Sequence, residues 1–139
     1  MEFGRLLAQK HEWGCGAACV ASLLAIPYND ALERLEQYKG ACINEKPKGL
    51  EPSPIAHVLR DAGYKVTKQY KAISWPLGTI VLLTWRFGRY KDCGHYMLLT
   101  GHGWMDPWFN LNKRPREAKY RSVLPKNTTV EVALVAKRS

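Results

Sequence analysis

The chain has 139 residues, 46% of them hydrophobic and 24% charged, which suffices for the core of one globular domain over residues 1–139. No apolar run approaches the length of a membrane span, and the first residues lack the basic and apolar segments of a signal peptide. We therefore expect no membrane span and a cytoplasmic location, although delivery in a virion or by secretion machinery fits the same composition. The charge of +9 is scattered, so it favours an acidic partner surface over specific nucleic-acid binding.

Cys15 precedes a run of small and apolar residues that extends from Ala17 to Ile26 and stops at Pro27. Such a run predicts a buried helix with Cys15 at its N-terminus. There the helix dipole and the free N–H groups of the first turn stabilise a thiolate, which is the nucleophilic form of cysteine. The alternative is an inert cysteine in an apolar core.

Two further helices are predicted in the first half of the chain. The second helix has Asn29 or Asp30 as its N-cap and ends at Gly40. The third begins at Ser53 and Pro54, because a hydroxyl residue followed by proline is typical of an N-cap and a first helical position.

The second half of the chain changes to the patterns of strands, with alternating or continuous apolar runs. A tight turn at His102 and Gly103 joins two of these strands, and a loop with little regular structure is expected over residues 107–119. The predicted strands cover residues 64–70, 79–85, 95–101, 104–106 and 128–136. Helices followed by an antiparallel sheet predict an α+β fold.

The surroundings of Cys15 suit an exposed nucleophile. Gly14 and Gly16 flank it and allow a sharp turn and the close approach of a substrate backbone. Gln9, six residues upstream, carries a side-chain amide that can point at the same place.

His95 and Asp106 lie on strands that a short hairpin joins, so the two side chains can meet at the open end of the sheet. Together with Cys15 they supply the elements of a thiol triad. The cysteine attacks a carbonyl, the histidine takes and returns the proton, and the aspartate holds the imidazole tautomer. Gln9 and the backbone N–H of Cys15 can donate hydrogen bonds to the oxyanion.

These residues occur in the order and spacing of a known family. The sequence resembles the papain-like cysteine peptidases of the bacteriocin-processing type, which cleave leader peptides after a double glycine. The segments that carry the resemblance are Gln9 six residues before Cys15, Cys15-Gly16 with two alanines and an apolar helix after it, the helix start Ser53-Pro54, residues 78–83, residues 94–99, and Asp106-Pro107.

The resemblance implies a papain-like fold in which N-terminal helices pack on a C-terminal antiparallel sheet. It implies Cys15 as nucleophile, His95 as base, Asp106 as orienting acid and Gln9 as oxyanion donor. Where the family usually has an acidic residue before the cysteine, this chain has Gly14.

We expect three residues beside the nucleophile and the base to contact the substrate, namely Trp13, Gly14 and Gly94. Because the match covers a peptidase domain alone, the expected protein is a stand-alone cysteine peptidase or related thiol amide hydrolase. It would act on a peptide or protein without a cofactor or metal.

Three alternatives remain open from the sequence. One is a catalytically silent papain-like domain that binds a peptide or protein, and another is a side-chain deamidase or acyltransferase. The third is a metal site, which by residue type could be formed by Cys93, His95, His102 and Asp106.

Overall fold

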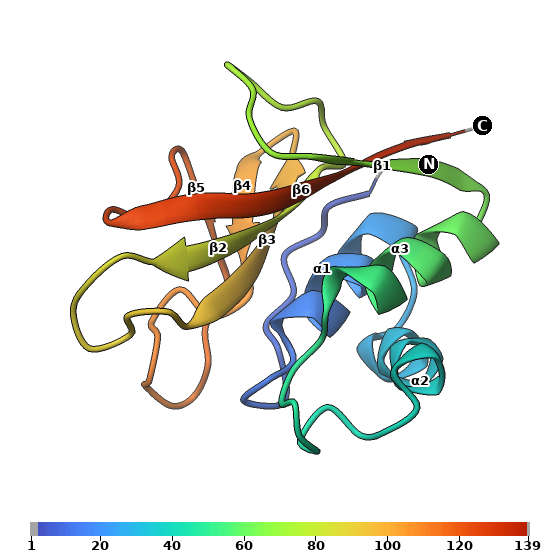
Figure 1. The fold of residues 1–139 in the computed structure, drawn as a ribbon, viewed down its shortest axis with the longest axis horizontal. Helices are drawn as coiled ribbons and strands as arrows, with labels where there is room; N and C mark the ends of the chain where they lie inside the picture. Colours follow the sequence, from blue (N-terminus) through green and yellow to red (C-terminus); the bar gives the residue numbers. More distant parts are fainter. Residues whose placement is uncertain (1–2, 139) are drawn as a thin grey trace.

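The structure is a computed structural model that describes residues 3–138, and residues 1, 2 and 139 lie outside the described part. Three helices cover one face of a six-stranded sheet (Figure 1). The helices precede all strands along the chain, which confirms the predicted α+β order. The helices are α1 (Cys15–Leu24), α2 (Tyr28–Lys39) and α3 (Pro52–Asp61), and the strands are β1 (Tyr64–Gln69), β2 (Ile80–Trp85), β3 (Gly94–Thr100), β4 (Gly103–Asp106), β5 (Lys119–Arg121) and β6 (Thr128–Arg138).

The three predicted helices are present, but their ends differ from the predictions. Helix α1 stops at Leu24 because Ala25 adopts a left-handed conformation with φ of 56°. Helix α2 begins one residue before Asn29 and two before Asp30, with Pro27 at the N-cap position. Helix α3 begins at Pro52, so that Ser53 lies in its first turn. The cause is the first of two nearby prolines, whose fixed φ and missing N–H suit the start of a helix.

The strands form one antiparallel sheet in the order β1-β6-β2-β3-β4-β5. The last strand of the chain, β6, lies between β1 and β2, so a segment near the C-terminus joins the first strand to the rest of the sheet. The predicted loop over residues 107–119 ends in the short strand β5, which pairs with β4. A three-residue strand is too short for any periodic pattern to reveal it.

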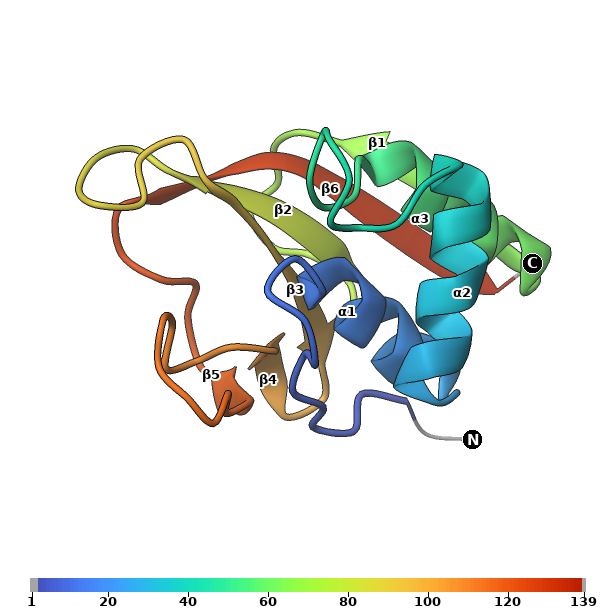
Figure 2. The same ribbon diagram turned by 90° about the horizontal axis from the view of Figure 1, so that it is seen from below.

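Helix α1 lies at the centre of the molecule. It contacts β3 on one side and α2 and α3 on the other (Figure 2). Eight of its ten residues are buried, and its small side chains, such as Ala17, Ala18 and Ala21, allow this close packing. The larger of two apolar clusters joins α1 to the other helices and the sheet, so the N-terminus of α1 is rigidly placed at the edge of the core.

Within residues 3–138, no single helix is long and apolar enough to cross a membrane. Helices α1 and α2 would together reach that length, but the chain bends by 116° between them.

The turn between β3 and β4 depends on Gly103, whose φ of +115° lies in the region that L-residues rarely adopt. A methyl group there would approach the carbonyl oxygen of Arg121 on β5 to 2.6 Å. We expect Gly103→Ala to lower the free energy of unfolding by about 2 kcal/mol, measured by urea denaturation. The control is Gly101→Ala in the same turn, where nothing lies within 4 Å of an added methyl group. Equal losses in the two variants would contradict this explanation.

Candidate active site

Cys15 is the first residue of α1 and is half-buried, with its thiol facing a pocket. Gly14 precedes it as the N-cap residue and is buried against Tyr28. A side chain at position 14 would collide with the hydroxyl oxygen of Tyr28, which also hydrogen-bonds the Nδ1 atom of His11. This contact gives a physical reason why glycine stands where the resembling family carries an acidic residue.

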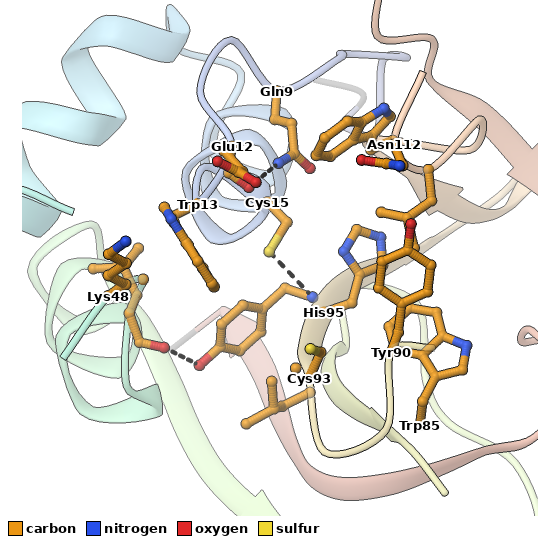
Figure 3. Close-up of a pocket in the computed structure, with 17 residues that line it drawn as sticks. Gln9, Glu12, Trp13, Cys15, Lys48, Trp85, Tyr90, Cys93, His95 and Asn112 are labelled. Atoms are coloured by element: carbon orange, nitrogen blue, oxygen red, sulfur yellow. Dashed lines mark hydrogen bonds between the residues drawn. The ribbon is translucent and has the colours of Figure 1, made fainter. Parts of the chain in front are cut away.

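His95 begins the buried part of β3, and Asp106 ends β4. Their side chains meet as the hairpin predicted, with 2.7 Å between His95 Nε2 and Asp106 Oδ1. Because Asp106 occupies Nε2, the other ring nitrogen, Nδ1, is left for Cys15. Figure 3 shows the Cys15 and His95 side chains facing each other from opposite walls of the pocket, and the interaction between them shifts the pKa values of both groups.

The surroundings of the Cys15 thiol favour its ionised form. Burial alone would raise the pKa of this thiol, but the hydrogen bond and positive charge of His95 outweigh burial. The backbone N–H groups of Tyr96 and Gly16 also stabilise the thiolate, and the Tyr96 nitrogen lies 3.4 Å from Sγ. The net result is a pKa below the ordinary value of a cysteine, as expected at a helix N-terminus beside a cation.

The imidazole of His95 is held in its protonated form. Burial lowers the pKa of His95, whereas the hydrogen bond to Asp106 and the hydrogen bond and charge of Cys15 raise it, and the net pKa lies above the ordinary value. Burial likewise raises the pKa of Asp106, but His95 and Arg121 lower it further, so the carboxylate stays ionised. Thiolate, imidazolium and carboxylate thus form an alternating series of charges.

The carboxylate of Asp106 is almost fully buried, with 3% of its side chain exposed, and both oxygens have partners. Oδ1 accepts the N–H of Trp108 at 3.0 Å in addition to that of His95. Oδ2 accepts a hydrogen bond from Nε of Arg121 at 2.8 Å. Sequence reasoning missed Arg121 because β5, which carries it, has no recognisable pattern.

Gln9 lies next to the predicted triad, since its backbone N–H donates to the carbonyl of Pro107, directly after Asp106. The side chain is buried and lines the pocket. Its amide nitrogen donates to the backbone carbonyls of His11 and Glu12, both at 2.9 Å. The amide oxygen is buried without a hydrogen-bond partner among the described residues. Donation to an oxyanion therefore requires one of the two carbonyl bonds to be given up.

The pocket brings together predicted site residues from both halves of the chain. Trp13 and Gly94 line it, as expected of substrate contacts, whereas Gly14 lies behind the wall against Tyr28 and does not line it. The complete lining is Gln9, Glu12, Trp13, Cys15, Lys48, Gly49, Leu50, Leu82, Trp85, Tyr90, Cys93, Gly94, His95, Tyr96, Trp108, Leu111 and Asn112 (Figure 3).

The other cysteines differ from Cys15 in their surroundings. Cys19 is fully buried one turn further along α1, and burial raises its pKa well above the ordinary value. Cys42 and Cys93 are exposed, and all four thiols are free. In the described part of the chain, no three His, Cys, Asp or Glu side chains are arranged to hold a metal ion, so Cys93, His95, His102 and Asp106 are not assembled as one metal site.

No protein-family model matches this sequence, and no curated protein is similar to it in sequence. Several solved structures are similar in fold, including the following two. One is a double-glycine motif protease from an AMS/PCAT transporter in complex with the leader peptide, with a TM-score of 0.64 and 15% identity over 99% of this chain and 95% of that chain. The other is the peptidase domain of Streptococcus ComA, a bifunctional ABC transporter involved in quorum sensing, with a TM-score of 0.59 and 13% identity over 98% of this chain and 99% of that chain.

Both similarities extend over nearly the whole chain, so they concern the complete arrangement of helices and sheet and not one motif. The identities are too low to show more than the fold. The chain therefore has the papain-like α+β fold of the double-glycine peptidase domains, as the sequence predicted.

Proposed function

We propose that the protein is a cysteine peptidase that cleaves a peptide bond with Cys15 as nucleophile and His95 as general acid and base. The observation that carries this proposal is the position of a thiol with a lowered pKa, which faces an accessible pocket beside the buried, hydrogen-bonded pair of His95 and Asp106. A cysteine that only packs in the core does not require a buried histidine–carboxylate pair beside it. The fold of the two peptidase domains supports the same activity.

The reaction follows from this geometry. The Cys15 thiolate attacks the carbonyl carbon, and the imidazolium of His95 donates its Nδ1 proton to the leaving amine. Water then attacks the acyl-enzyme while His95 accepts a proton, and the thiolate leaves. Asp106 stays ionised throughout, holds the Nε2–H of His95 and stabilises its positive charge.

Two donors are proposed for the oxyanion. The N–H of Cys15 has no carbonyl of its own helix to bind, because this residue begins α1. Gln9 is the second donor, in agreement with its place on the pocket wall. Its amide would exchange the bond to His11 or Glu12 for one to the oxyanion.

We propose a peptide or protein as substrate, because one of the similar structures is in complex with a leader peptide. The charge near the pocket favours an acidic one. Residues 86–93 and 107–116, here called the basic rim, contribute lining residues from two loops and contain six Lys or Arg but one Asp. This density of positive charge attracts acidic side chains on either side of the cleaved bond.

The aromatic residues of the second rim loop favour a peptide over a nucleic acid. The guanidinium groups of Arg114 and Arg116 lie 5.0 and 4.6 Å from the ring of Trp108, which is buried. The ring of Phe109 likewise lies beside two cations. Single-stranded nucleic acids need free aromatic faces on which bases can stack, and both rings of this loop already have cations beside them.

We expect the wild-type protein to cleave members of a synthetic peptide library and Cys15→Ala to cleave none, because the variant lacks the nucleophile. Mass spectrometry provides the measurement. New peptide termini identify a peptidase, and a shift of about one dalton without new termini would instead identify a deamidase. Cys42→Ala is the matched control and should retain activity. Binding of peptides without cleavage or deamidation would contradict the proposal and indicate a catalytically silent binding domain.

The pH dependence follows from the two shifted pKa values. Thiolate is present above the lowered pKa of Cys15, and imidazolium persists until the raised pKa of His95. As the pH increases, peptidase activity should therefore appear at a pH below the ordinary pKa range of cysteine. It should fall only when the pH passes the pKa of His95. Alkylation of Cys15 by iodoacetamide should follow the same acid limb. His95→Ala should shift the midpoint of this limb to higher pH, because the thiolate loses the stabilising charge of His95. An unchanged midpoint would contradict the ion pair between Cys15 and His95.

Charge reversal in the basic rim tests the proposed preference for acidic substrates. The wild type should select library peptides with Asp or Glu beside the cleaved bond. Replacing the exposed Lys91 and Lys113 together by Glu should reduce cleavage of those peptides about tenfold, and more strongly at low salt. The matched control is Lys65→Glu with Lys68→Glu, two exposed positions on β1 at the far edge of the sheet. Equal effects in both variants would show that the rim does not select charge.

A further inference from the structure

Arg121 on β5 contacts the oxygen of Asp106 that does not face His95. Its Nε atom lies 2.8 Å from Oδ2, while His95 Nε2 lies 2.7 Å from Oδ1. The Asp106 side chain is 3% exposed and that of Arg121 is 27% exposed. The ion pair is therefore screened little by water on the carboxylate side, and it connects the predicted triad to an edge strand.

Arg121 is fixed both at its guanidinium and at its backbone. Its carbon atom Cζ lies 4.5 Å from the centre of the Phe109 ring, which restricts the plane of the group. The backbone of Arg121 pairs with Trp104 on β4, two residues before Asp106. An arginine side chain fixed in this way can hold the carboxylate of Asp106 in one orientation.

We propose that Arg121 is a positioning residue of the thiol site, which keeps Asp106 ionised and turned so that Oδ1 faces the imidazole of His95. This inference rests on the proposed function, because it assigns to Arg121 a part in the same charge series. Arg121 touches neither the thiol nor the predicted substrate pocket, so it acts only through Asp106.

Removal of the Arg121 side chain would change the surroundings of the Asp106 carboxylate. Oδ2 would be left buried with no other hydrogen-bond donor among the described residues. A buried carboxylate oxygen without a partner is costly, so the group would bind a proton or rotate away from His95. Either change weakens the stabilisation of the imidazolium, and the thiolate that depends on the imidazolium becomes less stable in turn. This loss acts through direct hydrogen bonds and exceeds the weaker, longer-range repulsion between Arg121 and the imidazolium that is removed at the same time.

The test is the pH dependence of Cys15 alkylation by iodoacetamide, followed by mass spectrometry of the Cys15 peptide. In Arg121→Gln, the midpoint of the acid limb should rise by about one pH unit relative to the wild type. Arg121→Lys keeps the positive charge but lacks the planar guanidinium that orients the carboxylate. Its midpoint should lie between those of the wild type and Arg121→Gln.

Lys119→Gln is the matched control. Lys119 lies on the same strand and beside the same Phe109 ring, 5.0 Å from its centre, and its removal changes the charge equally. It does not contact the Asp106 carboxylate, so its midpoint should stay within about 0.2 pH units of the wild type. A shift in Lys119→Gln equal to that in Arg121→Gln would overturn the proposal, because general charge would then explain both.

Coupling to Asp106 separates positioning from a merely structural role. In an Asp106→Asn background, Arg121→Gln should cause no further rise of the midpoint, since the path through the carboxylate is already lost. A full additional shift would overturn the proposal. Thermal denaturation checks folding, and if Arg121→Gln does not fold, Arg121→Lys carries the same comparison.

Alkylation measures the thiol without any turnover, so two failures can be told apart. A wild-type midpoint at the ordinary value of cysteine would disprove the proposed function itself. A lowered wild-type midpoint that Arg121→Gln leaves unchanged would disprove only the role of Arg121.

Discussion

The series of charges from Cys15 through His95 to Asp106 is the interaction around which this molecule is arranged. The thiol lies at the end of a helix, the imidazole begins a central strand, and the carboxylate ends the next strand. Burial disfavours each of these ions taken singly. The charge of each one stabilises that of its neighbour at the boundary between the helices and the sheet.

The packing of α1 provides the rigidity that this arrangement requires. Its alanines let β3 and the other helices approach closely, and the core that they form fixes the direction in which Cys15 points. On the opposite side, the missing side chain of Gly103 lets β5 pair closely with β4, so that the side chains of Asp106 and Arg121 meet. The stability of the fold and the proposed chemistry therefore depend on the same contacts.

Sequence patterns predicted the parts of the site whose chemistry is local. The small and apolar run after Cys15 indicated a buried helix with a thiol at its start, and the hairpin predicted that His95 and Asp106 would meet. The same patterns misplaced the starts of α2 and α3, where prolines compete with the usual capping residues. They gave no indication that Gly14 is packed against Tyr28.

The sequence by itself determined the order of helices and strands and the residue types of a thiol site, because periodicity and helix ends are encoded within short segments. Only the tertiary structure decided the insertion of β6 between β1 and β2, the strand β5 and the contact of Arg121 with Asp106. It also decided that the Gln9 amide donates to two backbone carbonyls. These features join residues that are distant in the chain or depend on backbone groups, and no local pattern specifies such contacts.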